Sequence, residues 1–435
     1  MLHFRVESGG ALRGHLRVPG DKSLSHRAIM LGSLAEGSSQ VEGFLDGADC
    51  LATLNAFRAM GVTIEGPAQG RLIIHGVGLH GLQAPTESLD MGNSGTAMRL
   101  LAGVLAGQRF DSVLLGDASL NRRPMKRIIE PLSLMGAQIE ATDSATAPLH
   151  IHGGQRLTGI SYRMPIASAQ VKSCILLAGL YAQGRTAVTE PAPTRDHTER
   201  LLKGFGYPVE KQGDDVMLTG GGRLQACAID IPADISSAAF FMVGASIAPH
   251  SDLLLEHVGI NPTRTGIIQI LQRMGADITL SNERLSGGEP VADIRVKSAA
   301  LHGIEIPPEW VPLAIDEFPA VFIAAACAQG ETVLTGAEEL RLKESDRIAV
   351  MAEGLQTLGI VAQPTADGMR IQGGQLTGGT VDSHTDHRIA MAFAIAALRS
   401  NGPIHILDCT NVNTSFPGFA ELARGVGLML QEQVE

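Results

Sequence analysis

Aromatic side chains are scarce in this sequence. They make up 4% of the 435 residues, with one Trp and three Tyr. The chain therefore has little material for the stacking surfaces with which proteins bind single-stranded nucleic acid. Positive charge is also in deficit, since the formal net charge is −11 at pH 7. The overall field disfavours nucleic acid and anionic membranes as partners, although a local group of cations can still bind a small anion.

Cysteine and long apolar runs are equally limited. The five cysteines are scattered and never form a CxxC pair, which favours free thiols in a reducing cytoplasm. The first ten residues carry Arg5 and Glu7 and lack the apolar core of a signal peptide. The most apolar stretches, such as Cys174–Leu180, are far shorter than the ~20 residues of a membrane span. We therefore expect a cytoplasmic protein without a membrane partner.

Motifs for metals and nucleotides are missing or incomplete. His384 and His387 stand three residues apart, but no nearby residue completes a set of metal ligands. The run Gly76–Gly81 spells GxGxxG, yet Pro85 and a polar loop follow it, where a dinucleotide site needs a helix. Pro19–Ser23 lacks two glycines of a nucleotide phosphate loop, the one upstream and the one directly before the Lys. We expect no metal and no other cofactor.

Glycine, in contrast, is abundant, and some of the 51 glycines mark a repeat. A helix-like segment that ends in a Gly-led turn into a strand occurs six times, as FRAMGVTIE, LSLMGAQIE, LKGFGYPVE, LQRMGADIT, LQTLGIVAQ and ARGVGLMLQ. The glycines, at spacings of 68 to 84 residues, are Gly61, Gly136, Gly206, Gly275, Gly359 and Gly427. A glycine just after a helix is a common left-handed cap, and six matches at similar spacing indicate a repeat.

A second series of six segments follows the same rhythm. These segments, among them GTAMRLLAGVLAG and EFPAVFIAAACAQG, are apolar on almost every side, as in a buried helix. Short β-prone stretches such as RLIIHG and ETVLTG lie between them. Because 435 residues are too many for one ordinary core, the pattern predicts an α/β fold of two three-unit domains, with helices inside and sheets outside.

The buried segments begin with polar residues. If symmetry relates the repeats, six helix N-termini converge on a cleft between the domains, and each is a potential anion site. Ser, Asp and Asn at these places have a plainer explanation as N-caps. That explanation does not extend to Lys22, Arg27 and Arg388, because cations at a helix start oppose the helix dipole. We expect these cations to bind anions.

Eight stretches of the sequence resemble the 3-phosphoshikimate 1-carboxyvinyltransferases. They span residues 19–391 in the family's order and read PGDKSLSHRA, GNSGTAMRLL, GDASLNRRPM, ASAQVKS, TRDHTER, IDEFP, ELRLKESDR and DHRIAMA. The resemblance implies a two-domain inside-out α/β barrel, in which each domain has three βαβαββ units with buried central helices and outer sheets. It also implies one domain of residues 20–231, a second of residues 1–19 and 232–435, and an active site in the cleft between them.

The family transfers the carboxyvinyl group of phosphoenolpyruvate to the 5-hydroxyl of shikimate 3-phosphate through a tetrahedral ketal, releasing phosphate. Each substrate carries a carboxylate and a phosphate, so the site needs several cations, and guanidinium groups suit both anions. Protonation of the double bond and removal of the hydroxyl proton also require a positioned acid and a positioned base. The resemblance implies that Asp316 is the base, that Glu344 donates and accepts the proton at the methylene carbon, and that Lys22 is catalytic as well.

The resemblance also implies the binding residues. Those for shikimate 3-phosphate are Lys22, Ser23, Arg27, Ser168, Ala169, Gln170, Arg195, Asp316 and Lys343. Those for phosphoenolpyruvate are Lys22, Gly95, Arg123, Gln170, Arg347 and Arg388. Arg195 matches a phosphate ligand of one bacterial branch only, and Thr414 stands where some members carry a Lys near the departing phosphate. We expect these two substrates as the only partners of a monomer.

The family's inhibitor glyphosate occupies the phosphoenolpyruvate site. Gly95 stands where glyphosate-tolerant members often carry Ala, although other motifs resemble the tolerant bacterial branch. We therefore expect glyphosate to inhibit this protein.

Two alternatives remain open at this point. A sister family acts on UDP-N-acetylglucosamine, but it has Asn where this chain has Ser23 and a Cys on the loop near residues 116–124, where this chain has none. A catalytically inactive ligand sensor of the same fold is the second alternative. A sensor could lose acid–base groups without losing affinity, so the presence of Asp316 and Glu344 speaks against it. Taken alone, Glu344–Arg347 also fits an ordinary solvated helix face.

Overall fold

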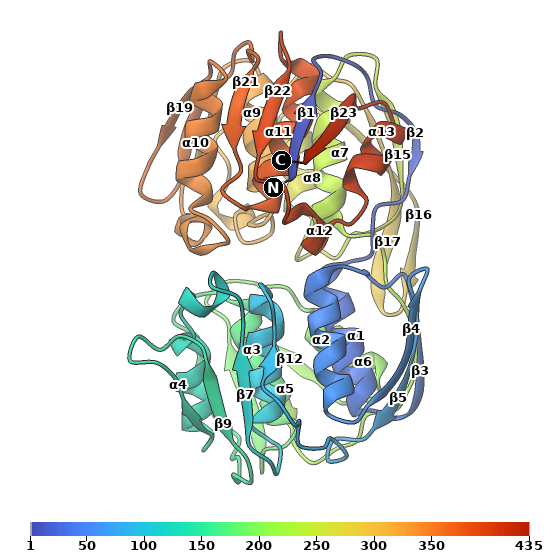
Figure 1. The fold of residues 1–435 in the computed structure, drawn as a ribbon, viewed down its shortest axis with the longest axis vertical. Coiled ribbons are helices and arrows are strands. Elements are labelled where there is room, and N and C mark those ends of the chain that lie inside the picture. Colours follow the sequence, from blue (N-terminus) through green and yellow to red (C-terminus); the bar gives the residue numbers. More distant parts are fainter. Residues whose placement is uncertain (1, 435) are drawn as a thin grey trace. The chain divides into compact units, whose positions relative to one another are not determined.

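A computed structural model describes residues 2–434 of the protein (Figure 1), and the chain forms two compact units. Unit 1 comprises Met1–Pro19, Pro232–Leu285 and Pro290–Glu435, and unit 2 comprises Gly20–Ile231 and Ser286–Glu289. The sequence-based boundaries place all of residues 232–435 in one domain, whereas the four residues Ser286–Glu289 belong to unit 2. The physical reason is that they bond there: the Ser286 hydroxyl donates to Asp230 at 2.5 Å, and Glu289 pairs with His197 at 2.8 Å.

Unit 2 contains three four-stranded sheets with the orders β14-β3-β5-β4, β6-β7-β9-β8 and β10-β11-β13-β12. The strands are β3 (Glu36–Glu42), β4 (Thr63–Ala68), β5 (Arg71–Val77), β6 (Leu89–Asp90), β7 (Ser112–Leu115), β8 (Gln138–Glu140), β9 (Leu149–His152), β10 (Ser161–Arg163), β11 (Arg185–Thr189), β12 (Glu210–Gln212), β13 (Asp215–Thr219) and β14 (Ala228–Asp230). In each sheet the first pair of strands is parallel and the other pairs are antiparallel.

Unit 1 follows the same pattern with the orders β2-β15-β17-β16, β21-β22-β1-β23 and β18-β20-β19. The strands are β1 (Leu2–Val6), β2 (Arg13–Leu16), β15 (Asp252–Gly259), β16 (Asp277–Ser286), β17 (Glu289–Lys297), β18 (Glu331–Leu334), β19 (Val361–Pro364), β20 (Met369–Gln372), β21 (Gly379–Asp382), β22 (Ile404–Leu407) and β23 (Leu430–Val434). In the three-stranded sheet, isolated parallel bridges from His302 and Glu305 stand where the other sheets have a leading strand. The N-terminal strand β1 lies between β22 and β23 (Figure 1).

Helices alternate with these strands. In unit 2 they are α1 (Lys22–Leu34), α2 (Ala48–Ala59), α3 (Gly95–Leu105), η1 (Leu120–Arg122), α4 (Lys126–Leu134), α5 (Ala169–Gly179) and α6 (His197–Gly204). In unit 1 they are α7 (Ile235–Ile247), α8 (Gly266–Arg273), η2 (Pro308–Trp310), α9 (Phe318–Cys327), η3 (Glu338–Leu342), α10 (Arg347–Thr357), α11 (His387–Ala396), η4 (Ala397–Arg399), α12 (Val412–Ser415) and α13 (Phe419–Gly425). No helix within residues 2–434 combines the length and the apolar character that crossing a membrane requires. The α/β class predicted from the sequence is confirmed.

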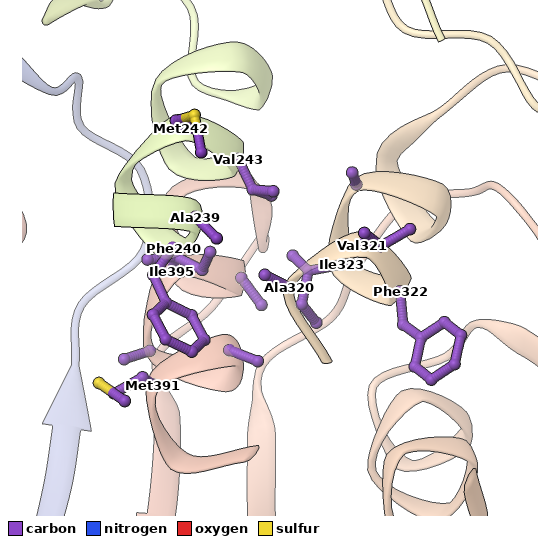
Figure 2. Close-up of a cluster of buried hydrophobic side chains, with 14 of the residues drawn as sticks. Ala239, Phe240, Met242, Val243, Ala320, Val321, Phe322, Ile323, Met391 and Ile395 are labelled. Carbon is purple, nitrogen blue, oxygen red and sulfur yellow. The ribbon is translucent and has the colours of Figure 1, made fainter. Parts of the chain in front are cut away.

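The apolar segments form the core. All thirteen residues of α7 are buried, and α1, α3, α5, α9 and α11 are buried along most of their length. Figure 2 shows side chains of α7, α9 and α11, among them Val243, Ile323 and Ile395, within one buried cluster. Because these helices have almost no polar face, burying them is the arrangement that removes most apolar surface from water.

The six repeat glycines also behave as the sequence predicts. All have positive φ, between 76° at Gly206 and 117° at Gly427. Each follows closely after a helix, for example α2 before Gly61 and α4 before Gly136. A side chain with a Cβ would be strained in this left-handed conformation, so the prediction of glycine caps is confirmed.

Another glycine allows two core helices of unit 2 to approach each other. A Cβ built on Gly103 of α3 would lie 2.2 Å from the carbonyl oxygen of Cys174 in α5. The contact atom is backbone, which cannot swing aside as a flexible side chain can. Close packing of α3 against α5 therefore depends on the absence of a side chain at this position.

We predict that Gly103→Ala destabilises the protein by ~1–3 kcal/mol, the usual cost of overpacking a core. The free energy of unfolding, measured by urea denaturation, checks this. Gly204→Ala in α6 is the matched control, because a Cβ there meets no atom within 4 Å. An equal effect of the two substitutions would contradict the packing argument.

Candidate active site

The first group of predicted residues lies at helix N-termini in unit 2. Helices α1, α3 and α5 are linked there by side chains: His26 contacts Ser94 at 3.4 Å, and the Gln170 amide donates to Thr96 at 3.0 Å. Burial lowers the pKa of His26 well below its usual value, and the charges of Lys22 and Arg27 add to this effect. His26 is therefore a neutral bridge between helix starts. We call the predicted residues of this unit the unit 2 cluster: Lys22, Ser23, Arg27, Gly95, Arg123, Ser168, Ala169, Gln170 and Arg195.

Lys22 is the first residue of α1, directly after the N-cap Asp21, whose carboxylate accepts the Leu24 N–H at 2.8 Å. The Lys22 ammonium forms an ion pair with Asp49 of α2, and the two side chains are 18% and 8% exposed. Asp49 offsets the unfavourable dipole at this position and fixes the ammonium. A small exposed fraction remains through which Lys22 can meet an anion.

Arg27 lies one turn further along α1 and is buried. Its guanidinium donates to neutral acceptors: to the Thr198 hydroxyl at 2.7 Å, to the Ser173 hydroxyl at 2.8 Å and to the Ser23 carbonyl at 2.9 Å. Burial lowers the pKa of Arg27 to about 10, and the positive charge of Arg195 acts in the same direction. Arg27 therefore stays charged at neutral pH, and it is too enclosed to be a side chain that merely extends from the core to water.

Gly95 begins α3 and is packed against two cations. Ser94 caps the helix by accepting the Ala97 N–H at 3.2 Å. A Cβ built on Gly95 would lie 3.1 Å from Nη1 of Arg99 and 3.3 Å from Nη1 of Arg123. The Arg123 guanidinium is oriented by Asn93, whose side-chain oxygen accepts at 2.8 Å. An added methyl group would therefore crowd Arg123, which is predicted to bind phosphoenolpyruvate, and its neighbour Arg99.

Ser23 follows Lys22 in α1, and the last four residues of the unit 2 cluster stand at the starts of α5 and α6. Ser168 caps α5 by accepting the Val171 N–H at 3.3 Å, and Ala169 and Gln170 are half-buried. Arg195 is also half-buried and lies two residues before α6.

A buried ion-pair network supports these two helix starts. The ammonium of Lys172, which is 0% exposed, pairs with Glu190 at 2.9 Å and with Glu199 at 2.7 Å. Glu190 in turn accepts the N–H of Thr194 at 3.1 Å. The network joins α5 to α6 and to the segment that carries Arg195.

The second group of predicted residues gathers around Arg347 in unit 1. Arg347 begins α10, and its side chain is 1% exposed. Its guanidinium donates to Asp386 from Nε at 2.8 Å and to Glu344 from Nη2 at 2.6 Å. The third nitrogen, Nη1, is buried without a hydrogen bond among the described residues, 3.5 Å from a carboxylate oxygen of Asp316. We call Asp316, Lys343, Glu344, Arg347 and Arg388 the unit 1 cluster.

Burial and ion pairing act in opposite directions on the pKa values of Arg347 and Asp386. Burial alone would lower the pKa of Arg347, but Asp386 and then Glu344 raise it above its usual range. Burial would likewise raise the pKa of Asp386, yet Arg347 holds it below the ordinary carboxyl value. Asp386 also caps α11 and accepts from the Ser345 hydroxyl at 3.0 Å. The Arg347–Asp386 pair is therefore charged on both sides in the folded protein.

Two carboxylates of the unit 1 cluster keep some contact with solvent. The side chains of Asp316 and Glu344 are 15% and 25% exposed. The ammonium of Lys343 lies 3.4 Å from Asp316. An arrangement of two accessible carboxylates beside an ammonium and a guanidinium can exchange protons next to a bound anion.

Arg388 differs from the other cations. Its backbone N–H donates to Asp386 at 3.0 Å, but within residues 2–434 its half-buried guanidinium makes no hydrogen bond or ion pair. It stands in the first turn of the buried helix α11, where the dipole favours an anion. Its guanidinium is therefore available to a ligand.

Other residues contact the clusters or are buried elsewhere in the same units, and the sequence does not identify their roles. Asp386 and Arg99 lie inside the quoted motifs, yet only the structure shows that Asp386 holds Arg347 and that Arg99 donates to Gln170 at 2.6 Å. A buried Arg264, which donates to Asp234 at 3.2 Å and lies 3.8 Å from Glu317, carries no sequence signal at all. Thr414 lies in α12 and donates to the Asn411 carbonyl at 2.7 Å. Residues 2–434 contain no group of three or more His, Cys, Asp or Glu that could hold a metal.

Comparison with known proteins gives a consistent result. Residues 6–422 match the profile of EPSP synthase (3-phosphoshikimate 1-carboxyvinyltransferase). The chain is 68% identical over 430 residues to the 3-phosphoshikimate 1-carboxyvinyltransferase of Alkalilimnicola ehrlichii, covering 99% of this chain and 96% of that protein. It is 67% identical to the one of Methylococcus capsulatus, covering 98% of each chain.

Solved structures agree with the sequence comparison. The EPSP synthase of Acinetobacter baumannii, 59% identical, aligns with a TM-score of 0.91 over 100% of both chains. The enolpyruvyl transferase NikO from Streptomyces tendae, 15% identical, aligns with a TM-score of 0.78 over 100% of this chain and 99% of that one, and this likeness concerns the fold alone.

We predict that Arg347→Gln destabilises the protein by about 3–5 kcal/mol at pH 7, because it leaves buried carboxylates uncompensated. The lowered pKa of Asp386 stabilises the folded state above the ordinary carboxyl pKa of about 4, and this contribution is lost as the pH falls through the folded-state pKa. The difference in the free energy of unfolding between wild type and variant should therefore decrease below about pH 4.

Urea denaturation at pH 7, 5 and 3.5 measures this difference. The control is Arg370→Gln, which breaks an ion pair with Glu331 whose partners are 48% and 41% exposed, and which should cost less than about 1 kcal/mol. A cost for Arg347→Gln that does not change with pH would show that the Asp386 carboxylate is not its cause.

Proposed function

The chain belongs to the EPSP synthase (3-phosphoshikimate 1-carboxyvinyltransferase) family, and on that premise we propose how its two clusters carry out the family's reaction. The protein transfers the enolpyruvyl group of phosphoenolpyruvate to shikimate 3-phosphate. The finer proposal is that the 5-hydroxyl is the acceptor, that the reaction passes through a tetrahedral ketal, and that both clusters serve the same pair of substrates. The observation that carries it is the contact of Asp316 and Glu344 with the cations of the unit 1 cluster.

The addition step needs a base and an acid. Asp316 removes the proton of the 5-hydroxyl, whose oxygen then attacks C2 of phosphoenolpyruvate while Glu344, in its protonated form, delivers a proton to the methylene carbon. A positioned acid or base of this kind contributes roughly 10²–10⁴-fold to a rate. Arg347 and Lys343, 3.5 Å and 3.4 Å from Asp316, favour the ionised carboxylate that a base requires.

The elimination step reverses the roles at the same carbon. The ketal loses a proton from its methyl group to Glu344 and expels phosphate from C2, so the C–O bond to phosphate breaks and the vinyl double bond forms again. Glu344 accepts a hydrogen bond from Arg347 at 2.6 Å, which orients its carboxylate for this proton transfer. Lys22, held by Asp49, would complement negative charge as the ketal forms and collapses.

Anion binding is divided between the clusters in this proposal. Shikimate 3-phosphate is bound by residues of both units, namely Lys22, Ser23, Arg27, Ser168, Ala169, Gln170 and Arg195 in unit 2 and Asp316 and Lys343 in unit 1. Phosphoenolpyruvate is bound by Lys22, Gly95, Arg123, Gln170, Arg347 and Arg388. The unpaired guanidinium of Arg388 and the buried Nη1 of Arg347 support this assignment, because each has donor capacity that no described residue uses.

The finer description of the fold is also proposed here: an inside-out barrel of six βαβαββ units, three in each domain. The proposed domains are residues 20–231 and residues 1–19 with 232–435, apart from Ser286–Glu289, which lie in unit 2. This description is supported by the strand order that the sheets share and by the buried helices. We further propose that the protein works as a cytoplasmic monomer without a metal or another cofactor. Dialysis against EDTA should leave its activity unchanged, and full loss would contradict that part.

The test of the overall function is incubation with both substrates, followed by phosphorus NMR. Inorganic phosphate should appear only when both phosphoenolpyruvate and shikimate 3-phosphate are present. Replacing shikimate 3-phosphate with UDP-N-acetylglucosamine should give none, and release with that acceptor would point to the sister family instead.

We predict that Asp316→Asn and Glu344→Gln each lower kcat by roughly 10²-fold or more, while the dissociation constant of shikimate 3-phosphate changes much less. Steady-state kinetics and calorimetry give the two quantities. Glu353→Gln on the exposed face of α10 serves as the control and should leave both unchanged. A near-normal rate in either variant would remove that residue from the mechanism.

Glyphosate should inhibit the wild-type protein in competition with phosphoenolpyruvate, and Gly95→Ala should weaken this inhibition by about 5- to 150-fold. The added Cβ would lie 3.3 Å from Nη1 of Arg123, and glyphosate is longer than phosphoenolpyruvate. Crowding of a tight site costs ~1–3 kcal/mol, which corresponds to that range. The inhibition constants of both proteins check this, with Gly204→Ala as a control. Equal inhibition would show that residue 95 does not set the length of the pocket.

A further inference from the structure

The hairpin tip Ser286–Glu289 makes a set of polar contacts inside unit 2 that the reaction described above does not use. It connects β16 to β17, and its residues belong to unit 2 although most of both strands belongs to unit 1. The Ser286 hydroxyl donates to Asp230 at 2.5 Å, the Arg200 guanidinium donates to the Gly288 carbonyl at 3.3 Å, and His197 pairs with Glu289 at 2.8 Å. The tip is therefore bound at three points rather than resting loosely on the surface.

Glu289 is the residue of the tip that is most deeply enclosed. Its side chain and that of His197 are each 3% exposed, and Nε of Arg200 lies 4.0 Å from its second carboxylate oxygen. A buried carboxylate is costly unless it is paired and hydrogen-bonded. The contacts with His197 and Arg200 meet that requirement, so Glu289 holds both residues of α6 in place.

The first turn of α6 is next to the cations proposed for shikimate 3-phosphate. Thr198 follows His197 and accepts a hydrogen bond from Arg27 at 2.7 Å, and Glu199 pairs with the buried Lys172 at 2.7 Å. Arg195 lies two residues before His197. A shift of this turn would therefore move an acceptor of Arg27 and the segment that carries Arg195.

The negative charge of Glu289 also acts on Arg27. Burial lowers the pKa of Arg27, and the negative charges of Glu199, Asp21 and Glu289 act against this lowering. No carboxylate hydrogen-bonds directly to Arg27 in the contacts described for it, since its acceptors are Thr198, Ser173 and the Ser23 carbonyl. Glu289 thus contributes part of the negative field in which this buried cation sits.

We propose that Glu289 is a positioning residue for the phosphorylated acceptor substrate: by holding His197 it fixes the first turn of α6, and through that turn it orients Arg27 and Arg195 toward the substrate. The inference rests on the proposed function, because it takes these two arginines as ligands of shikimate 3-phosphate. Glu289 itself touches neither substrate nor reacting atoms. Its effect should therefore fall on the binding of one substrate and not on the chemical step.

The test compares Glu289→Gln with wild type. Glutamine keeps the size of the side chain but removes the charge. We expect the dissociation constant of shikimate 3-phosphate alone, measured by calorimetry, and the KM for it to rise about 10-fold, the effect of losing a buried hydrogen bond to a carboxylate. The KM for phosphoenolpyruvate and kcat should change less than twofold. Glu283→Gln, an exposed position on β16 of the same hairpin, is the matched control and should match wild type.

The outcomes distinguish the proposed function from the positioning role of Glu289. If wild type does not bind shikimate 3-phosphate, the proposed function fails and not only this inference. If wild type binds it and Glu289→Gln binds it equally well, the positioning role is overturned. Equal increases in both KM values, with a lower thermal midpoint, would also overturn it in favour of general stabilisation. Should Glu289→Gln fail to fold, His197→Gln is measured in the same way, and a KM increase confined to shikimate 3-phosphate supports the proposal while an unchanged or uniform response overturns it.

Discussion

The buried guanidinium of Arg347 is the constraint on which the unit 1 cluster depends. Its hydrogen bonds to Asp386 and Glu344, with Asp316 at 3.5 Å, draw residues from the starts of α9, α10 and α11 to one point. Without this cation three carboxylates would repel one another in a poorly hydrated place, and without them the cation could not remain buried. The mutual requirement fixes Asp316 and Glu344, the two carboxylates proposed for acid–base chemistry, and Lys343 lies 3.4 Å from Asp316.

In unit 2 a buried cation is stabilised in a different way. Arg27 is buried against neutral acceptors, and its carboxylate neighbours act at longer range. Such a cation keeps more of its charge uncompensated than Arg347 does, which suits the binding of a phosphate group. The two clusters are therefore not equivalent. In unit 1 ionic contacts hold the carboxylates proposed for acid–base chemistry, and in unit 2 hydrogen-bonded cations lie at helix N-termini, where the helix dipole favours anions.

Much of this organisation could be predicted from sequence because it is encoded locally. The six glycines mark left-handed caps at the same place in each repeat, and the apolar segments identify the buried helices. Contacts between distant residues could not be predicted in this way. The pairs Lys172–Glu190 and His197–Glu289 join residues 18 and 92 positions apart, and no periodicity or motif specifies which carboxylate meets which cation. The placement of Ser286–Glu289 in unit 2 has the same origin, since it depends on those contacts and not on the hairpin's own sequence.

In the proposed mechanism the acceptor hydroxyl attacks C2 of phosphoenolpyruvate and not its phosphorus. The most direct measurement uses phosphoenolpyruvate with ¹⁸O in the oxygen that bridges carbon and phosphorus, followed by phosphorus NMR of the released phosphate. Addition and elimination at carbon break the C–O bond, so the label should leave with inorganic phosphate. Label retained in the organic product, with unlabelled phosphate released, would mean that the P–O bond breaks and would rule out addition and elimination at carbon.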